Sequence, residues 1–334
     1  MARPPRLARI YSGTARNLAQ LAGVLRRGGL VAVPTETVYG LAADALDARA
    51  CAGIYRAKGR PSTNPLIVHI ADLAALEDLA CTNEASHRLA AAFWPGPLTL
   101  VLPKRKEVPD LVSAGLPSVA VRLPAHPLFR RLLRLTGRPL AAPSANPSGY
   151  VSPTTAEHVR AGLGTRIRHI LDGGPCPVGL ESTIVDVRDP RRPCLLRPGA
   201  ISRAELETVL GRPVHVRTVV AGEETPQLAP GQLRRHYSPR TPITLHARLA
   251  PDAARTGTPR EAWVFLSRPP GRRRSNVYWF DVRGDLRGVA RRLFAVLRHL
   301  DAAGYRRLHL ELAPDTDGLS HAINDRLQRA ASRG

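Results

Sequence analysis

Residues 30–40 read LVAVPTETVYG, and the expected fold is built outward from this stretch. Its first four residues form a short apolar run, which predicts a buried strand. Thr35, Glu36 and Thr37 follow at the carboxyl end of that strand, where α/β sheets gather their ligands. Two hydroxyls and a carboxylate at this place suit a small polar ligand. A helix N-cap by Thr35, with Glu36 in the first turn, explains the same residues equally well, so both interpretations stay open.

Further strands and helices alternate around this stretch. Apolar spacing and capping residues, Asp47 and Ser202 among them, predict helices over residues 15–28, 47–57, 84–93, 127–135, 154–162 and 202–210. Short apolar runs predict strands over residues 66–70, 98–102, 119–123, 140–142, 168–171, 183–187 and 194–196. Many of these strands are consecutive along the chain. The pattern therefore predicts an α/β fold, with a mixed twisted sheet and helices packed against it.

The chain changes character at residues 211–240, which contain few periodic apolar positions. We interpret this segment as a linker between a domain of residues 1–210 and one of residues 241–334. The second unit has strands expected over residues 243–246, 262–266, 276–281 and 307–312, and helices over residues 285–300 and 318–331. This order predicts a smaller, Rossmann-like α/β sheet.

Length and composition exclude several classes of protein. With 334 residues, of which 43% are hydrophobic, the chain is long enough for two domains with real cores. No apolar run approaches the ~20 residues of a membrane-spanning helix, so no membrane association is expected. We find no secretory signal, and the four cysteines form no C-x-x-C motif. A disulfide framework or zinc site is not expected, and the composition fits the cytoplasm.

The strongest bulk feature is a net charge of +22, from 49 basic and 27 acidic residues. Such a charge favours contact with nucleic acid or with polyanionic substrates. Because Lys58, Lys104 and Lys106 are the only lysines, an arginine-rich genome composition explains the charge as well. A double-stranded RNA-binding module without catalysis is the main alternative function. Aromatic residues make up only 4%, which leaves such a module few stacking platforms.

Two loops carry polar residues suited to anions, although the Walker A, dinucleotide-binding, serine-hydrolase and H-E-x-x-H motifs are absent from the sequence. In KGRPSTN, residues 58–64, Lys58 and Arg60 flank a glycine and can face one anion. In APSANPSG, residues 142–149, Ser144 and Asn146 can cradle phosphate oxygens. A solvated loop and ordinary turn chemistry are the simpler interpretations.

Arg122 lies in VAVRLP, residues 119–124, which is otherwise apolar. A buried, unpaired arginine would cost several kcal/mol, so a partner is expected: Glu36, Glu181 or a ligand carboxylate. His69 ends an apolar run and is more typical of a core histidine than of a ligand-binding one. The simple alternative interpretation of Arg197 is that it is one surface arginine among many.

Taken together and in order, these segments resemble the YrdC-like threonylcarbamoyl-AMP synthases. The resemblance is carried over roughly residues 10–210 by PTETVYGLAADA, KGRPSTNPLIVHI, WPGPLTLVL, VAVRLP, APSANPSG, GLESTIVDV and LLRPGA. The segment APGQLRRHYSPRTPI is similar to the linker of the long, two-domain form of that family. Three positions depart from the family pattern: Ala42 replaces a common glycine, and Ala229 and Gln232 replace the usual serine and methionine.

The resemblance implies a twisted α/β sheet around a basic cavity, and a reaction. L-threonine, bicarbonate and ATP would give L-threonylcarbamoyl-AMP, pyrophosphate and water, with Mg²⁺ held mainly by the ATP phosphates rather than by protein. The product would pass to the downstream machinery that makes N6-threonylcarbamoyladenosine in tRNAs reading codons that begin with A. A weak contact of the chain with tRNA or double-stranded RNA would be compatible with this role.

The resemblance also assigns residues to roles. The catalytic positions of the family fall on Lys58, Arg60, Ser144 and Asn146. Its ATP contacts fall on Arg60, Asn64, Ser118, Ser144, Ser152 and Arg197, and the linker tyrosine that closes over the nucleotide matches Tyr237. Its threonine contacts fall on Thr37, His69, Arg122, Ala142 and Ser182.

Overall fold

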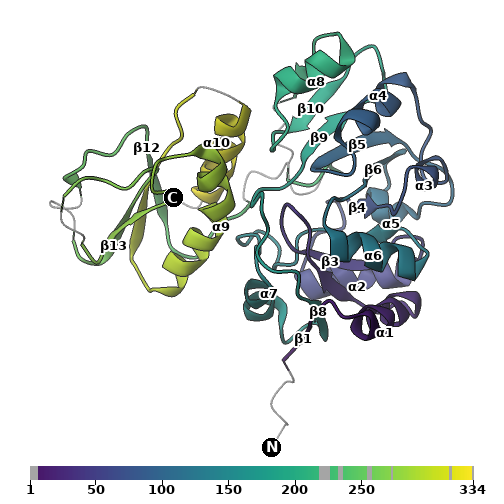
Figure 1. The fold of residues 1–334 in the computed structure, drawn as a ribbon, viewed down its shortest axis with the longest axis horizontal. Coiled ribbons are helices and arrows are strands. Elements are labelled where there is room, and N and C mark those ends of the chain that lie inside the picture. The colour runs from purple at the N-terminus through teal and green to yellow at the C-terminus, as the bar shows by residue number, and fades with distance from the viewer. Residues whose placement is uncertain are drawn as a thin grey trace, which may run out of the picture.

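The computed structural model describes residues 7–217, 226–231, 236–253, 258–271, 274–315 and 318–332. Its strands form two separate sheets, a larger one built from residues before 217 and a smaller one that begins at Ile243 (Figure 1). Part of the predicted linker lies outside the described residues, including Gln232. Residues 226–231 and 236–240 of the linker are described.

The larger sheet has 11 strands within residues 7–217 and mixes parallel with antiparallel pairs. Its strands lie in the order β1 (Arg9–Tyr11), β8 (His169–Leu171), β2 (Val31–Val33), β3 (Gly40–Asp44), β7 (Leu140–Ala141), β4 (Ile67–His69), β6 (Ser118–Arg122), β5 (Leu98–Pro103), β9 (Thr183–Asp186), β10 (Cys194–Arg197) and β11 (His215–Val216). This confirms the expected mixed sheet.

Helices pack against both faces of this sheet, because residues that alternate along its strands belong to two separate cores. The helices of the larger unit are α1 (Ala15–Arg26), α2 (Ala48–Lys58), α3 (Ala74–Glu77), α4 (Glu84–Phe93), α5 (Asp110–Ser113), α6 (Pro127–Thr136), α7 (Ala156–Leu163) and α8 (Arg203–Leu210). The main core joins α2, α4 and α8 to the sheet, and a second core joins α1 and α6 to β2 and β7. On the second face, which is the face opposite to the main core, Leu228 and Ala229 of the linker cover a small apolar strip of strand residues.

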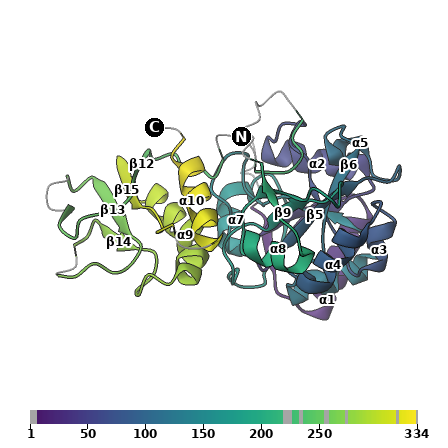
Figure 2. The same cartoon turned by 90° about the horizontal axis from the view of Figure 1, so that it is seen from above.

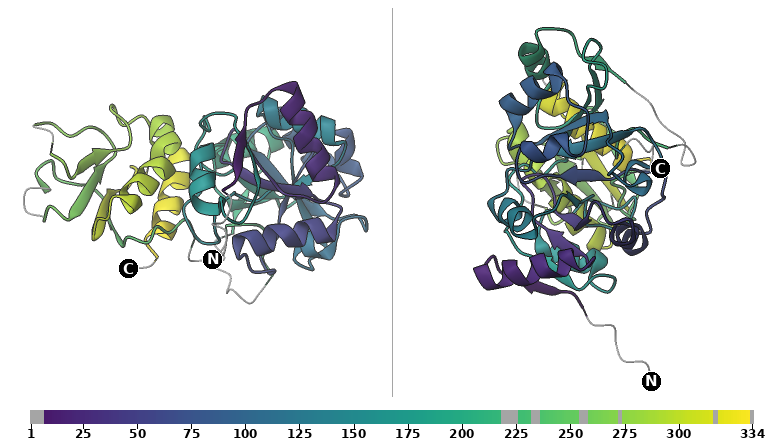
Figure 3. Two further views of the ribbon diagram at one scale, coloured as in Figure 1. Left: turned by 90° about the horizontal axis from the view of Figure 1, so that it is seen from below. Right: turned by 90° about the vertical axis from the view of Figure 1, so that its right-hand side faces the viewer.

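The smaller unit is an all-parallel sheet in the order β12 (Ile243–His246), β15 (Arg307–Glu311), β13 (Glu261–Phe265) and β14 (Val277–Trp279). Two helices, α9 (Leu286–Ala302) and α10 (Gly318–Ala330), complete it. They lie between the smaller sheet and the larger unit (Figures 1 and 2). Figure 3 shows the same arrangement from two further sides. Helix faces of the second unit are therefore turned toward the linker and the site.

Local signals predicted many of these elements well. Helix α4 occupies the predicted residues 84–93, and α8 has the expected Ser202 cap, completed as a capping box by Glu205. Helix α2 begins after its predicted cap Asp47 and ends at Gly59 in a left-handed conformation, where glycine avoids a steric clash.

The alternative of a helix N-cap at Thr35 is wrong. The chain instead turns back after residues 34–39 and forms β3, which pairs with β2 as an antiparallel hairpin. The Thr35 hydroxyl closes this turn, because it accepts hydrogen bonds from the N–H groups of Thr37 and Val38. Strand β3 has the sequence GLAAD, whose small buried residues show no alternation, so the sequence analysis missed it.

The four cysteines are free thiols. In the ranges given above, no helix combines the length and the apolar character that crossing a membrane requires.

Candidate active site

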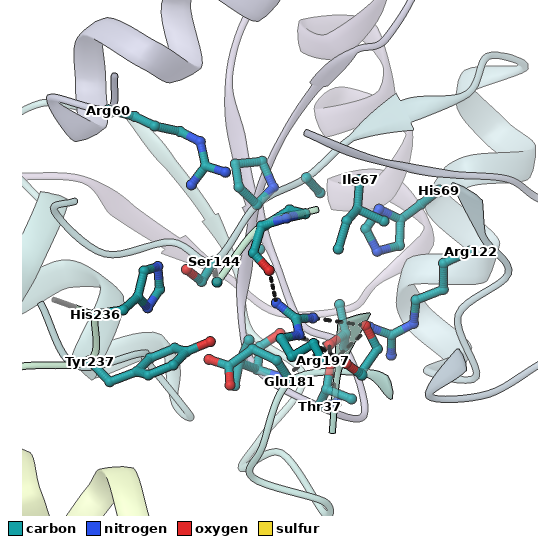
Figure 4. A pocket seen from close by; sticks show the side chains of 18 residues that line it. Thr37, Arg60, Ile67, His69, Arg122, Ser144, Glu181, Arg197, His236 and Tyr237 are labelled. Carbon is teal, nitrogen blue, oxygen red and sulfur yellow. Dashed lines mark hydrogen bonds between the residues drawn. The ribbon is translucent and has the colours of Figure 1, made fainter. Parts of the chain in front are cut away.

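A cavity lies on the second face of the larger sheet, beside the strip that the linker covers (Figure 4). Strand alternation decides which side chains reach it: Val68 and Val121 enter the helix-covered core, so the next residues, His69 and Arg122, face the cavity. The parallel register of β4 and β6 places these two side by side. The predicted site residues that line the cavity are Thr37, Arg60, His69, Arg122, Ala142, Ser144, Ser182, Arg197 and Tyr237.

Arg122 has the acidic partner that its burial requires. Of the three candidates, the structure selects Glu36: Arg122 Nη2 lies 2.6 Å from Glu36 Oε1 as an ion pair, at an angle that is not that of a hydrogen bond. The guanidinium also donates from Nη1 to Thr37 Oγ1 at 3.0 Å and from Nε to Gly96 O at 3.2 Å. A guanidinium has five N–H donors, so these contacts leave Arg122 able to bind a carboxylate as well.

His69 is both a buried histidine and a cavity residue. Burial, with Arg122 nearby, lowers the pKa of His69 to about 3, so the ring is neutral at physiological pH. Its Nδ1 has no hydrogen-bond partner among the described residues. Because buried polar atoms are normally paired, an open nitrogen in a cavity wall points to a ligand partner.

Lys58 lies behind the cavity wall rather than in it. Lys58 is 2% exposed, and its ammonium donates to the carbonyl oxygens of Ser144 and Asn146, each at 2.5 Å. Burial, with Arg60 nearby, lowers the pKa of Lys58 well below its usual value. The Asn146 amide donates to backbone carbonyls of its own loop, while its Oδ1 has no partner in the described part of the chain. Lys58 thus fixes the loop that presents Ser144 to the cavity.

Arg60 reaches the cavity from the end of helix α2 (Figure 4). Its Nε donates to Asn64 O at 3.0 Å, and Nη2 donates to Asn64 Oδ1 at 2.5 Å and to Pro65 O at 2.7 Å. Burial lowers the pKa of Arg60 to about 10, which still leaves it charged at neutral pH. Asn64 itself does not line the cavity; it positions the guanidinium.

Arg197 is a buried cation of the site, and the alternative of an ordinary surface arginine is wrong. It donates from Nε to Ser182 O and from Nη2 to Ser182 Oγ, both at 3.1 Å. A third donation, from Nη1 to Pro230 O at 3.1 Å, ties the linker to the site. Ser182 Oγ is also 2.8 Å from the hydroxyl oxygen of Thr99.

The linker crosses the cavity at two places, residues 230–231 and 236–237. Tyr237 has a backbone φ of 62°, an uncommon conformation for a residue other than glycine. The His236 and Tyr237 rings meet edge to face with centroids 4.0 Å apart. His236 Nδ1 and Tyr237 Oη are buried and find no partner among the residues described. With the linker in place, only about 40 Å³ of space remains in the cavity.

Two further predicted residues do not line the cavity. Ser118 begins β6 opposite Pro103 and is buried. Ser152 donates from its hydroxyl to Glu181 Oε1 at 2.6 Å. Glu181 lines the cavity, and its other carboxylate oxygen accepts from Arg326 of helix α10.

The sequence analysis missed part of the site. His236 stands next to the predicted Tyr237, and its place in the HYSP segment was the available signal. Pro230 and Gly231 belong to the quoted linker motif, and a side chain at Gly231 (φ 90°) would crowd Arg197 and Tyr237. Arg326 offered no signal at all, since it lies on an ordinary amphipathic helix far along the chain.

Fold and site together define a two-domain α/β protein whose cavity is walled by buried arginines, hydroxyls and a linker. Two family models match the chain. The model named Sua5_yciO_yrdC, described as "Telomere recombination", matches residues 23–199, and "Threonylcarbamoyl-AMP synthase, C-terminal domain" matches residues 201–332. The chain belongs to this Sua5/YrdC family, in the form that has both domains.

Relatives resemble the chain over nearly its whole length. A threonylcarbamoyl-AMP synthase of Bacillus subtilis is 42% identical, covering 94% of this chain and 92% of the relative. One from Pyrococcus abyssi is also 42% identical, covering 93% and 92%. A solved structure titled as P. abyssi Sua5 complexed with L-threonine is 38% identical and has a TM-score of 0.88, covering 97% of this chain and 98% of that one.

Proposed function

We propose that the chain is a threonylcarbamoyl-AMP synthase, an enzyme of the nucleotidyltransferase type. It converts L-threonine, bicarbonate and ATP into L-threonylcarbamoyl-AMP, pyrophosphate and water. One observation carries the proposal: a single cavity holds Arg122 on one side and Arg60 with Arg197 elsewhere in its wall (Figure 4). An amino-acid carboxylate and a triphosphate need separate cationic groups close together, and this cavity supplies both.

The threonine end lies around Arg122. Its remaining N–H groups bind the carboxylate, while the hydroxyls of Thr37 and Ser182 and the open Nδ1 of His69 offer partners for the amine and hydroxyl. Ala142 leaves room for the substrate methyl group. The complex of the P. abyssi relative with L-threonine supports an amino-acid site in this fold.

The reaction proceeds without a protein nucleophile. The threonine amine attacks bicarbonate and forms a carbamate, while an amine proton and the bicarbonate hydroxyl leave as water; if bicarbonate first takes up a proton and loses water, the amine attacks the resulting carbon dioxide instead. The carbamate oxygen then attacks the α-phosphorus of ATP and displaces pyrophosphate. Both steps concentrate negative charge, so catalysis consists of positioning and electrostatic stabilisation. Arg60 and Arg197 neutralise the phosphates, Ser144 donates to them, and Lys58 holds the Ser144 loop in place.

Mg²⁺ accompanies ATP in this proposal. Among the described residues, no group of three or more His, Cys, Asp or Glu side chains is arranged to hold an ion. The carboxylates beside the cavity, Glu36 and Glu181, pair with Arg122 and Arg326. These residues fit an ion carried mainly on the phosphate oxygens, where it supplies positive charge to the leaving pyrophosphate.

The linker acts as a lid. The remaining 40 Å³ cannot hold ATP, since ligand pockets for molecules of that size exceed about 300 Å³. Residues 226–231 and 236–237 must therefore move for the nucleotide to enter. When they return, Tyr237 and His236 turn their unpartnered polar atoms toward the ligand and exclude water from a hydrolysable intermediate.

The product serves formation of N6-threonylcarbamoyladenosine in tRNA, through a downstream enzyme that transfers the threonylcarbamoyl group. That partner, a weak contact of the chain with tRNA and a cytoplasmic location stay predictions. Salt-dependent binding of tRNA to the purified chain tests the contact, because phosphate contacts weaken steeply as salt rises.

The deciding experiment incubates the chain with ¹⁴C-bicarbonate, ATP and Mg²⁺, and with each amino acid in turn. We expect labelled adenylate and pyrophosphate with L-threonine, and neither without an amino acid. Binding of RNA without any threonine-dependent consumption of ATP would overturn the proposal in favour of an RNA-binding module.

A further inference from the structure

Arg326 is a fully buried cation at the junction of the two domains. It lies on helix α10, and its side chain is 0% exposed. Its Nη1 donates to the neighbouring Asp325 at 2.7 Å, but its other donors leave the C-terminal domain. Nε donates to Glu181 Oε2 at 2.9 Å, and Nη2 donates to Pro198 O at 3.0 Å.

One of those contacts belongs to the wall of the cavity, and the other lies next to a wall residue in the chain. Glu181 lines the cavity, and Pro198 directly follows Arg197. The second oxygen of Glu181 accepts from Ser152. One carboxylate is therefore held from both sides, by a hydroxyl of the catalytic domain and by a guanidinium of the C-terminal domain.

Arg326 also supports the lid. Its guanidinium carbon lies 5.3 Å from the centre of the Tyr237 ring, and Phe294 of helix α9 lies 5.4 Å from the same ring. Tyr237 thus rests on two side chains of the C-terminal domain. A guanidinium over a tyrosine face is attractive, and the attraction grows when water is excluded.

The charge of Glu181 explains why a cation is needed here. An unpaired carboxylate in the wall of a cavity that takes a triphosphate would repel the ligand, and a buried charge without a partner is costly in itself. Burial lowers the pKa of Arg326, but Tyr237, Glu181 and Asp325 raise it by more, so the group stays charged.

We propose that Arg326 is a positioning residue through which the C-terminal domain completes the nucleotide side of the site. It neutralises Glu181, keeps that carboxylate on Ser152, and holds the Tyr237 ring in the lid. The C-terminal domain thereby contributes to ATP affinity without contacting the reacting atoms. This inference rests on the proposed function, because it assigns the phosphates of ATP to this cavity.

The test uses the full-length chain and the variants Arg326→Met, Glu181→Gln and the combination of both. ATP affinity is measured by calorimetry, and the KM for ATP, the KM for threonine and kcat are measured in the adenylate assay. We expect Arg326→Met to weaken ATP binding at least about tenfold, with a much smaller change in the KM for threonine. Added to Arg326→Met, Glu181→Gln removes the unpaired carboxylate charge and restores ATP affinity to within about threefold of the wild type.

Arg298→Met is the matched control. Arg298 is also a buried arginine of the C-terminal domain, but among the described residues its side chain donates hydrogen bonds to the backbone carbonyls of residues 151, 152 and 158 and to no side chain. We expect this variant to lower the melting temperature and to leave ATP affinity within about twofold of the wild type. A loss of ATP affinity as large as that of Arg326→Met would mean that domain docking alone matters.

Two further results would overturn the inference: unchanged ATP affinity in Arg326→Met, or failure of Glu181→Gln to rescue it. If Arg326→Met does not fold, the double variant decides, because ATP affinity more than about tenfold below the wild type in that variant contradicts the charge argument. Failure of the wild-type chain to bind ATP and form the adenylate overturns the proposed function instead, so the two failures are distinguishable.

Discussion

Replacement of Lys58 by methionine separates a supporting role from direct contact with substrate. Methionine keeps most of the buried stem and removes the two hydrogen bonds to Ser144 O and Asn146 O. A hydrogen bond to a charged group contributes about 1.5–3 kcal/mol, and removal of the ammonium relieves part of its burial cost. We expect a net loss of about 3 kcal/mol in the free energy of unfolding.

For a domain of this size, that loss lowers the melting temperature by about 6–12 °C. We expect the loop to shift by about 1 Å and to displace Ser144 with it. A displacement of that size lowers turnover about a hundredfold. Hydrogen exchange measures the loop directly: the N–H groups of Ala145 and Ser148 donate to backbone oxygens and should lose protection.

Lys104→Met is the control, since the half-buried Lys104 also bonds a backbone carbonyl, that of Val108, and pairs with the exposed Asp110, but does not line the cavity or hold the Ser144 loop. Its stability should change by less than about 1 kcal/mol and its turnover should not change. If Lys58→Met loses turnover while its melting temperature and loop protection equal those of the wild type, the ammonium acts directly on substrate and the positioning argument is refuted.

Three further predictions concern charge, pH and the lid. Arg60→Ala should lower turnover about 10²-fold in the adenylate assay while circular dichroism shows a folded protein; near-normal turnover would exclude Arg60 from the phosphate site. His69 is protonated near pH 6.5 in the unfolded chain but only near pH 3 in the folded chain. Its neutral form therefore contributes fully to the free energy of unfolding above pH 6.5, and this contribution falls by up to about 1.4 kcal/mol per pH unit as the pH drops toward 3. Urea unfolding should show a shallower loss in His69→Gln, and equal pH slopes in both proteins would contradict this assignment. ATP with threonine should protect residues 211–240 from protease, and unchanged cleavage of this segment would count against a lid.

Local signals in the sequence were reliable where the physics is local. The caps Asp47 and Ser202 are set by neighbouring residues, and the chain forms helices after both. Arg122 was recognised as needing a partner because a charge in an apolar run is costly wherever it occurs. The motif order pointed to the family, whose models cover both domains.

Other features depend on how distant segments meet. Strand β3 was missed because its small residues carry no alternation, and pairing with β2 creates it. Lys58 was expected to face substrate, but its direction is set by the loop at residues 144–146, more than 80 positions away. No local pattern reports such a contact.

The sequence by itself determined the residue types and their order, and with them the chemistry that the chain carries. It also determined most helix limits and the need of Arg122 for an anionic partner, because these features follow from neighbours along the chain. Only the tertiary structure decided which residues far apart in the sequence are in contact. Arg326 reaches Glu181 across 145 positions, and the lid tyrosine rests on helices α9 and α10. Such contacts arise from the packing of two domains, and the energy of packing belongs to pairs of surfaces rather than to any single segment.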